Sequence, residues 1–415
     1  MSTTPKPPIP GLAPDAVPLA GPRFHTDPGP LHRELRQRHG PVVPVALPGD
    51  IPAWLVIGYR ELHHVIGDSA LFPRDPGLWN QWPRVPRDWP LLAMINRRQP
   101  SIHYTVGHEH KRHVDMVVPA LEAVDTFQLR RHAEEVADAL VDTFCGQGEA
   151  ELIDGYAGLL PIHVLGRMIG VPDAECPALA GALNALAAGG DDAVAGHQDL
   201  GAAMRRLVAA KRAVPGADVT SRMLTHPGGF SDEEYVLDLA AVIAAGHQPT
   251  ADWIGNTLVA MLTDDRFAAS LTGGRRSVGD AMNLVLWEDT PTQILAGRWA
   301  ARDTHLGGQR LLAGDMLLLG LQGAHGDPHV RYAGHPHTGG HQAHFSFSHG
   351  EFRCPFPAQE IAEIIARTGI EVLLDRLPDM DLAVPPEELV RRRSPFLRGL
   401  SALPVRFTPS TPIRP

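Results

Sequence analysis

The chain has 415 residues, a formal net charge of −10 and three cysteines, and 44% of its residues are hydrophobic. The negative charge excludes nucleic acid as the expected partner, and no apolar run reaches the roughly 20 residues that span a bilayer, so no membrane anchor is expected. Cys145, Cys176 and Cys354 are too few and too scattered for a disulfide framework, and the N-terminus lacks a signal-peptide pattern, so we expect a cytoplasmic protein.

The predicted elements begin after a proline-rich arm at residues 1–24. A helix is expected over 30–39, followed by two strands at 42–47 and 53–58. Helices then dominate, the clearest at 127–144, 159–169, 195–214 and 232–262, before short strands within 293–320 and a helix over 357–375. Many helices, a minor β-region and no visible boundary predict one mainly α, α+β domain over residues 25–415.

The helix expected at 232–262 opens with a capping box, Ser231 to Glu234, and is apolar nearly all round, so we expect it to cross the interior. It contains Gly246 and Pro249, which cost a helix about 1 and 3 kcal/mol relative to alanine. Pro249 has no N–H, so the carbonyl of Ala245 loses its usual partner. Two interpretations stay open, a helix opened to face bound water or dioxygen and a structural kink without chemistry.

The stretch FSFSHGEFRCPFPAQEIAE, residues 345–363, places Cys354 between a glycine-bearing loop and a predicted helix. A lone cysteine is most often a small buried hydrophobe. Backbone N–H groups of such a loop, together with a helix N-terminus, can stabilise a thiolate, which is a metal ligand or a nucleophile. No Cys/His pair at metal-binding spacing lies beside it, so a cofactor that supplies the other ligands is favoured, and haem iron with one axial thiolate fits.

On these residues the sequence resembles the cytochrome P450 haem-thiolate monooxygenases in their soluble bacterial form. Their haem loop, Phe-Gly-x-Gly-x-His-x-Cys-x-Gly, is matched at Phe347, Gly350 and Cys354. Ser348, Phe352 and Phe356 stand at the other three positions. The resemblance covers nearly the whole chain in order, with the strand pair at 42–58, residues 152–175, AAGHQPT at 244–250, the haem loop and LPVRF at 403–407.

The resemblance implies a P450-like fold in which a long interior helix crosses a haem b held by the cysteine loop, with Cys354 as axial iron ligand. Ala245, Gly246 and Thr250 would form the oxygen-binding groove, although Gln248 and Pro249 stand at the acid positions. It also implies a ferredoxin and a ferredoxin reductase as electron donors, and insertion of one oxygen atom into an apolar small molecule of secondary metabolism.

Two haem-propionate contacts match the family, His110 and Arg298. Two others differ, because Val114 replaces an arginine and Phe352 replaces a histidine. We expect that Arg112 or His113 could compensate for Val114. The rival interpretation makes Lys111 and Arg112 part of a solvated helix face.

The buried Glu-x-x-Arg network of the family is replaced as a set. Leu284 and Trp287 stand at the Glu and Arg positions, and no arginine lies between Tyr332 and Phe347. Removing one partner of a buried ion pair costs about 3–5 kcal/mol, whereas exchanging the whole set for apolar residues can be neutral. The chain thus resembles an actinobacterial subgroup that lacks the complete motif.

Two clusters have less specific interpretations. The histidines at 335, 337, 341, 344 and 349 suggest zinc by spacing, but a solvated loop is favoured because no cysteine or carboxylate matches. The tryptophans at 79, 82 and 89 either line an apolar substrate pocket or are buried by packing.

Two functions remain. The first is a haem-thiolate monooxygenase, favoured by Cys354, Thr250 and the Ala-Gly pair. The alternative is a haem-binding regulatory or interaction protein that kept the fold with weak or no turnover, favoured by Gln248, Pro249 and the replaced ion network.

Overall fold

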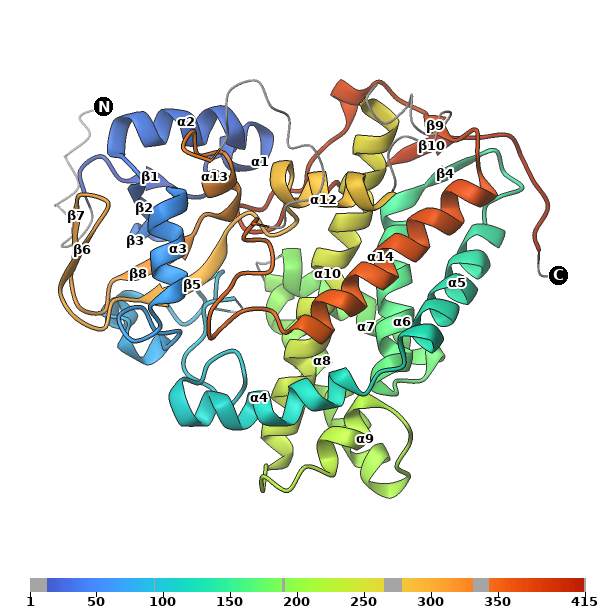
Figure 1. Ribbon diagram of the computed structural model, residues 1–415, viewed down its shortest axis with the longest axis horizontal. Coiled ribbons are helices and arrows are strands. Elements are labelled where there is room, and N and C mark those ends of the chain that lie inside the picture. Colours follow the sequence, from blue (N-terminus) through green and yellow to red (C-terminus); the bar gives the residue numbers. More distant parts are fainter. Residues whose placement is uncertain (1–12, 93, 189–190, 265–277, 331–342, 414–415) are drawn as a thin grey trace.

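The structure is a computed structural model, and it describes residues 13–92, 94–188, 191–264, 278–330 and 343–413. A five-stranded sheet occupies one side of the molecule and a large group of helices occupies the other (Figure 1). The cysteine loop lies where these two parts meet, between strand β8 and the last long helix in the sequence.

The five-stranded sheet has the order β1-β2-β3-β8-β5. Its strands are β1 (Val17–Pro18), β2 (Val42–Leu47), β3 (Ile51–Val56), β8 (Met316–Leu319) and β5 (Leu295–Trp299). β2 and β3 form an antiparallel hairpin, β3 pairs with β8 in parallel, and β5 pairs with β8 antiparallel with a register shift between Ala296 and Arg298. Helices α1 (Arg23–Thr26), α2 (Pro28–His39), α3 (Tyr59–Gly67) and α13 (Leu321–His325) lie beside this sheet (Figure 1).

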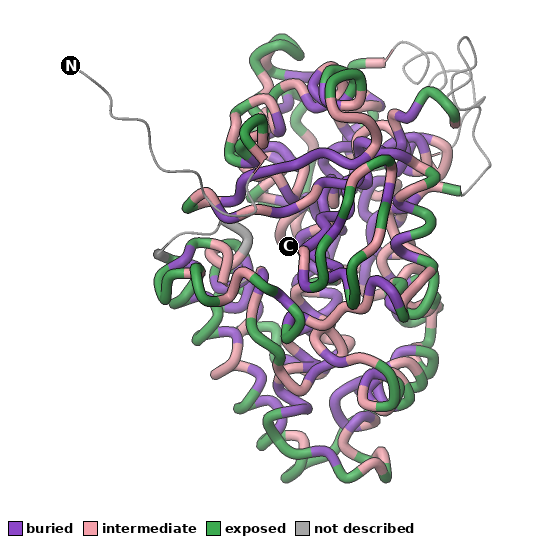
Figure 2. The backbone as a smooth tube through the Cα atoms, turned by 90° about the vertical axis from the view of Figure 1, so that its left-hand side faces the viewer, coloured by how far each residue is buried: buried purple, intermediate pink, exposed green. Residues whose placement is uncertain are grey.

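The helical part is built around α10 (Asp232–Thr263), which packs on several other helices. These are α6 (Leu159–Ile169), α7 (Cys176–Ala188), α8 (Asp191–Ala213), α9 (Val219–Leu224), α12 (Val278–Glu288) and α14 (Phe356–Arg376). Outside them, α5 (Thr126–Asp142) packs on α14 and α6, and α4 (Gly107–Glu122) packs on α14 and α9. The capping box is present, since Ser231 accepts from the Glu234 N–H and Glu234 accepts from the Ser231 N–H. Buried residues follow α10 on almost every side. Figure 2 shows the buried residues gathered in the interior of the molecule, with exposed residues along its outer turns.

Two small sheets complete the fold. β4 (Glu149–Glu151), β10 (Pro404–Arg406) and β9 (Asp381–Leu382) form one, in the order β4-β10-β9, and β6 (Thr304–Leu306) pairs with β7 (Gln309–Leu311) in the other. Single-turn helices lie at residues 76–78, 82–84, 153–157, 173–175 and 386–388. The mainly α fold with a minor β-region is confirmed.

The predicted elements differ from the structure in three respects. The second strand ends at Val56 rather than residue 58, because Gly58 caps α3. Helix α7 was not expected, and α8 begins four residues before the predicted start. The proline-rich arm is not wholly separate, because β1 at Val17–Pro18 pairs with β2, while residues 1–12 lie outside the described part. The single domain over 25–415 stays a prediction.

Candidate functional site

A cavity of about 770 Å³ lies between the two parts of the molecule. Its size falls within the roughly 300–1,000 Å³ typical of cofactor and ligand sites. Its lining comes from the loop before α4, from α4, α6, α7 and α10, from β5 and from the cysteine loop. Six predicted site residues line it together, namely Ala245, Gly246, Thr250, Phe347, Gly350 and Cys354. His110 lines it as well, whereas Arg298 lies behind the lining, against the Phe352 ring.

The cysteine loop is shaped by two residues with left-handed backbone. Gly350 has φ +70°, and a Cβ atom there would lie 2.9 Å from the carbonyl oxygen of Ile66, so only glycine fits. Ser348, at a family glycine position, also has φ of 58°, which is uncommon for a residue with a side chain. The Cys354 N–H donates to the carbonyl of Phe347 at 2.9 Å and closes the loop.

The protein alone does not stabilise a thiolate at Cys354, contrary to the expectation from the loop and the helix N-terminus. Burial raises the pKa of the Cys354 thiol to about 12. Within the described residues, the hydrogen bonds of Cys354 involve its backbone, through Phe347 and through Gln359, which donates to its carbonyl at 2.6 Å. Because a bound metal cation deprotonates a coordinating thiol outright, the charge of an iron ion would have to supply the missing stabilisation.

The α10 wall of the cavity contains Ala245, Gly246, Gln248, Pro249 and Thr250. Pro249 lies inside α10, and the helix continues on both sides of it. A Cβ atom on Gly246 would approach the Leu165 side chain to 3.0 Å, so this glycine also permits the close packing of α6 on α10. These predicted groove residues are therefore brought together at one wall, and their catalytic role stays a prediction.

One edge of the cavity holds two arginines, Arg74 and Arg298, for which the described residues supply no ion pair. Within the same part of the chain, the Nε and one Nη atom of Arg298 and the Nε2 atom of His110 are buried without a hydrogen-bond partner. Burial, followed by the charge of Arg74, lowers the pKa of Arg298 to about 9, although the charge of Glu351 favours its protonated form. A buried cation without a counter-ion is costly, so this edge calls for an anionic ligand, and the two propionates of a haem fit it.

Phe352 shapes this edge in place of the family histidine. Its ring lies 4.9 Å from the His110 ring, and the Arg298 guanidinium lies 4.8 Å over its face. The aromatic face therefore holds Arg298 by a cation–π contact. The Nδ1 atom of His110 lies 3.1 Å from the Ile102 carbonyl, which orients the ring and leaves Nε2 for a ligand.

The sequence analysis missed three residues at the same edge, Arg74, His103 and Tyr104, all of which line the cavity. Burial, then the charges of Arg74 and His110, lowers the pKa of His103 to about 3. Arg74 thus supplies a cation that Val114 cannot, from a loop rather than from α4. No local pattern marks Arg74, because it follows Pro73 in an irregular segment far from the matched motifs.

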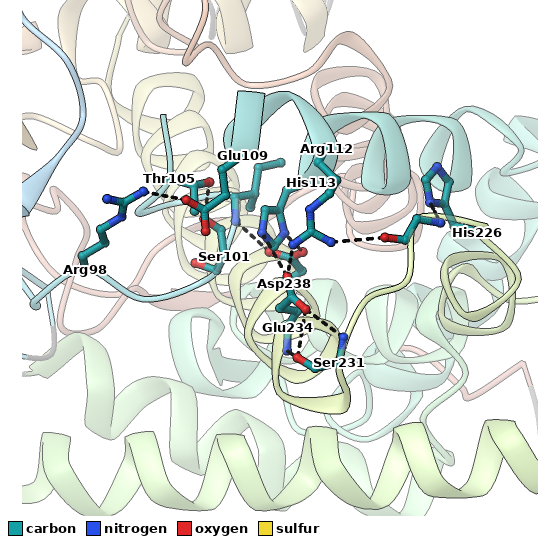
Figure 3. Close-up of polar contacts among 12 residues, drawn as sticks. Arg98, Ser101, Thr105, Glu109, Arg112, His113, His226, Ser231, Glu234 and Asp238 are labelled. Atoms are coloured by element: carbon teal, nitrogen blue, oxygen red, sulfur yellow. Dashed lines mark hydrogen bonds and ion pairs between the residues drawn. The ribbon is translucent and has the colours of Figure 1, made fainter. Parts of the chain in front are cut away.

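Arg112 and His113 do not compensate for Val114, and that expectation is wrong. Arg112 pairs with Glu234 and lies over the Phe230 ring, with its guanidinium carbon 4.1 Å from the ring centre. His113 Nδ1 lies 2.5 Å from the Asp238 carboxylate, which also accepts from the Ile102 N–H at 2.7 Å. Figure 3 shows both α4 side chains directed toward the start of α10, which they tie to α4 and to the loop before it.

Lys111 is on a solvated face, as the rival interpretation predicted. Its ammonium group pairs with Asp115 at 2.7 Å, and its side chain is 70% exposed. Exposed pairs of this kind contribute little to stability, about 0–1 kcal/mol. The α4 helix therefore directs His110 and Val114 toward the cavity and Lys111 toward solvent.

The tryptophans are packing residues rather than a pocket lining. Trp79 and Trp89 are buried, and their ring centres lie 5.7 Å apart in the core beside the sheet. Trp82 donates to the Pro76 carbonyl at 2.6 Å. The cavity is lined from this part of the chain by Met94, Ile95 and Ile102 instead.

The histidine cluster is only partly within the described residues, since those at 335, 337 and 341 lie outside them. His344 lies near Trp287, and His349 lies near His63, with ring centres 4.4 Å apart. In the described part of the chain, the group with metal-ligand geometry lies elsewhere, at His163, Asp173 and Cys176. Asp173 there is already paired with Arg167 at 2.8 Å.

Among the described residues, none of the helices is long and apolar enough to span a membrane. No protein-family model matches the chain. Individual proteins do match. The chain is 29% identical to cytochrome P450 monooxygenase PikC of Streptomyces venezuelae, over 98% of this chain and 96% of that protein. It is 27% identical to mycinamicin IV hydroxylase/epoxidase of Micromonospora griseorubida, over 89% and 93% of the two chains.

Solved structures agree with these relatives. CYP154A1 from Streptomyces coelicolor A3(2) superposes with a TM-score of 0.84 at 26% identity, over 94% of this chain and 100% of that one. CYP154C4 from Streptomyces sp. W2061 gives a TM-score of 0.83 at 27% identity, over 94% and 97%. The chain therefore has the cytochrome P450 fold. Over its full length it resembles the monooxygenases of that family, whose cofactor is haem b.

Proposed function

We propose that the chain inserts one oxygen atom of dioxygen into an apolar small molecule of secondary metabolism. Two electrons come from a ferredoxin that a ferredoxin reductase reduces, and two protons are consumed, so that the second oxygen atom leaves as water. The observation that carries the proposal is the single cavity lined by Cys354, by the α10 residues Ala245 to Thr250 and by apolar side chains. A cytoplasmic site for this reaction fits three cysteines that are all unpaired.

Four side chains would hold the haem. Cys354 would bind the iron, with Phe347 lining the cavity beside it, and Arg298 and His110 would pair with the propionates. When bound, a thiolate-ligated haem would supply the electron donation that favours cleavage of the O–O bond. Gly350 lets the loop pass close to Ile66 and so sets the position of Cys354.

Three α10 groups would handle dioxygen and protons. Pro249 cannot donate to the Ala245 carbonyl, so this carbonyl is free to accept from a water molecule at the cavity wall. Thr250 carries a hydroxyl group beside it, which can donate to oxygen and pass on a proton. Gln248 lacks the ionisable proton of a carboxylic acid.

The substrate-facing lining is largely apolar. It includes side chains from the loop before α4 and from α4, α6, α7 and α10, namely Met94, Ile95, Ile102, Val117, Leu121, Leu165, Met168, Leu183 and Val242. Burial of a hydrophobic substrate there is favourable by about 25 cal/mol per Å². Relatives such as mycinamicin IV hydroxylase/epoxidase and polyketide biosynthesis cytochrome P450 PksS support a polyketide or another apolar secondary metabolite as the substrate.

The test supplies electrons through a surrogate ferredoxin and reductase, and screens lipids, polyketides and aromatics for a substrate-induced shift of the haem spectrum. The compounds that bind are then incubated with isotopically labelled dioxygen. We expect one labelled oxygen atom in the product and the other in water. A product whose new oxygen comes from water would contradict the proposal.

Thr250 is tested beside a matched threonine. Thr257 lies on the same helix, but it donates to the Trp253 carbonyl at 2.7 Å and does not line the cavity. We expect Thr250→Ala to divert reducing equivalents to hydrogen peroxide and Thr257→Ala to leave the product yield per electron unchanged. If neither change alters the product yield per electron, Thr250 does not have the role proposed for it in the groove.

A regulatory haem-binding protein is the second candidate. It is favoured by Gln248 and Pro249 at the acid positions, and by Leu284 and Trp287 in place of the ion network. The same assay separates the two, because this candidate predicts tight haem binding without product from any binder.

A further inference from the structure

A buried carboxylate stands behind the cavity wall at Asp252, one helical turn after Gln248 on α10. Its side chain is 3% exposed. Burial raises the pKa of this carboxyl to about 6, although Arg392 and Gln248 favour its charged form. Nothing in the family resemblance points to this position, since the family acid precedes Thr250 rather than following it.

Asp252 is linked to the cavity through Gln248. The side-chain amide of Gln248 donates to Asp252 Oδ1 at 3.1 Å, while Gln248 itself lines the cavity. The amide oxygen of Gln248 is buried and has no hydrogen-bond partner among the described residues. A water molecule in the cavity would satisfy it, since buried polar groups are normally hydrogen-bonded.

Asp252 is also linked to solvent, through Arg392. The guanidinium contacts both carboxylate oxygens at 2.5 Å, and the Arg392 side chain is 29% exposed. The backbone is close as well, because a Cβ atom on Gly399 would lie 2.1 Å from Asp252 Oδ1. The same segment contributes Phe396 and Leu397 to the cavity lining, so Asp252 lies between this cavity wall and the surface.

We propose that Asp252 is the carboxylic acid that delivers protons to the cavity in place of the missing acid at Gln248, with Gln248 as its gate. The inference rests on the proposed monooxygenase function, which consumes two protons for each dioxygen. A proton enters from solvent beside Arg392 and binds the Asp252 carboxylate. Rotation of the Gln248 side chain then lets cavity water reach the carboxyl. The carboxyl gives its proton to that water while the water passes one of its own to the Thr250 hydroxyl.

The competing interpretation is purely structural, with Asp252 only anchoring the segment at 391–399. Asp289 provides the matched control. It is also held by arginines of this segment, Arg391 at 2.5 Å and Arg398, but it does not line the cavity and contacts neither Gln248 nor Arg392 within the described residues. If Asp252 only anchors the segment, substituting it should have the same effect as substituting Asp289. If Asp252 donates protons, the two substitutions should differ.

The experiment uses the haem-loaded protein with surrogate ferredoxin and reductase and a substrate found by spectral shift. Product formed per NADPH is measured against pH for Asp252→Asn, Asp252→Glu and Asp289→Asn. We expect Asp252→Asn to lower this ratio by about tenfold or more, since general acids contribute roughly 10²–10⁴-fold. In the wild type the ratio should fall as pH rises through about 6, where the carboxyl loses its proton, and this dependence should vanish in Asp252→Asn.

Two rescues sharpen the test. Asp252→Glu keeps an acid and should retain most of the coupling, and Gln248→Glu in the Asp252→Asn background restores an acid at the cavity wall and should recover it. Asp289→Asn should leave the ratio and its pH dependence as in the wild type. The proposal is overturned if Asp252→Asn couples like the wild type, or if Asp289→Asn uncouples to the same extent.

A measurement without turnover separates this inference from the proposed function. Infrared difference spectra of the haem-loaded protein should show a protonated carboxylic acid that titrates near pH 6 in the wild type and is missing from Asp252→Asn. If the wild type forms no product with any binder, the proposed function fails while the infrared band still decides whether Asp252 holds a proton. A wild type that forms product but lacks the band overturns the inference alone.

Discussion

The middle of helix α12 is apolar, whereas the residue just beyond its C-terminal end is held by charge. Leu284 and Trp287 are 7% and 1% exposed, and the Trp287 ring lies 5.2 Å from the His325 ring and 6.0 Å from the His344 ring. Aromatic packing here occupies the place of the family's buried Glu-x-x-Arg network.

Asp289, two residues after Trp287, accepts instead from Arg391 at 2.5 Å and from Arg398. Asn256 of α10 bridges the group, since it accepts from Arg391 at 2.5 Å and donates to the Arg398 carbonyl at 2.8 Å. This ion cluster of Asp289, Asn256, Arg391 and Arg398 ties α10 and α12 to the C-terminal segment.

The comparison of the apolar site at Leu284 and Trp287 with the ion cluster shows where the fold tolerates a buried charge. At the ion cluster each charged group has an opposite charge within contact, whereas at Trp287 the meander arginine that a glutamate would need is missing from the sequence. A buried charge is stable only with its full set of partners. Packing therefore replaces the whole ion network at Leu284 and Trp287, whereas the charge of Asp289, just beyond the end of α12, is retained together with its partners.

Reinstating the family charges should have the largest effect. Leu284→Glu with Trp287→Arg removes two core side chains, each worth about 2–5 kcal/mol, and buries a glutamate with one partner. We expect a loss of about 5 kcal/mol in unfolding free energy and weaker haem retention. Thermal melts and haem content measure this, with Leu284→Met as the volume-conserving control. A double variant as stable as the wild type would mean that the charges still have partners.

Breaking the ion cluster should cost less. Asp289→Ala leaves Arg391 and Arg398 without their carboxylate, and their side chains are only 19% and 13% exposed. We expect a loss of about 3 kcal/mol, the lower end for a broken buried pair. Asp381→Ala is the control, because its pair with Arg406 is 60–67% exposed and is worth about 0–1 kcal/mol. Equal losses at both sites would reject the distinction between buried and exposed pairs.

A buried charge without an ion pair should behave in the opposite way. Within the described residues Arg298 is held only by the Gly297 carbonyl and the Phe352 ring. We therefore expect Arg298→Met to stabilise the haem-free protein by about 2 kcal/mol while its haem retention falls. Chemical denaturation of the haem-free form and competition for haem by apomyoglobin give the two values. Arg112→Met, which breaks the pair with Glu234, should lower stability without weakening haem binding directly. An Arg298→Met variant that is less stable without haem would show that the arginine has a protein partner.

The smallest effect concerns pH. Because the folded-state pKa of Asp252 is raised from 3.8 to about 6, the folded protein binds this proton more tightly than the unfolded chain does. The resulting stability is fully present below pH 3.8 and is lost as pH rises through about 6. The full rise from 3.8 to about 6 corresponds to about 3 kcal/mol, since one pKa unit corresponds to about 1.4 kcal/mol. Relative to Asp252→Asn, the wild type should lose about 1 kcal/mol of this between about pH 5 and pH 7. Denaturant unfolding at several pH values measures it, and a constant difference would contradict the raised pKa.

The fold and the cysteine loop could be predicted because their signals are local. The capping box starts α10 where the sequence places it, and Phe347, Gly350 and Cys354 lie within one short loop. The interior helix and the strand hairpin follow from runs of apolar residues that need no distant partner.

Contacts between distant segments could not be predicted in the same way. Arg392 meets Asp252 across 140 residues, and the direction of Arg112 toward Glu234 depends on how α4 crosses α10. Arg74 reaches the cavity from an irregular loop without any periodic pattern. The family resemblance therefore pointed to His110 and Arg298, but the compensating cation was assigned to the wrong segment.

The central claim is that Cys354 holds the iron of a haem b in this cavity, and one spectrum tests it most directly. The reduced carbon monoxide complex of the purified, haem-loaded protein is recorded for the wild type and for Cys354→Ser. We predict the red-shifted Soret band of thiolate-ligated iron in the wild type and its loss in Cys354→Ser. A wild-type spectrum of histidine ligation that persists in Cys354→Ser would contradict the account.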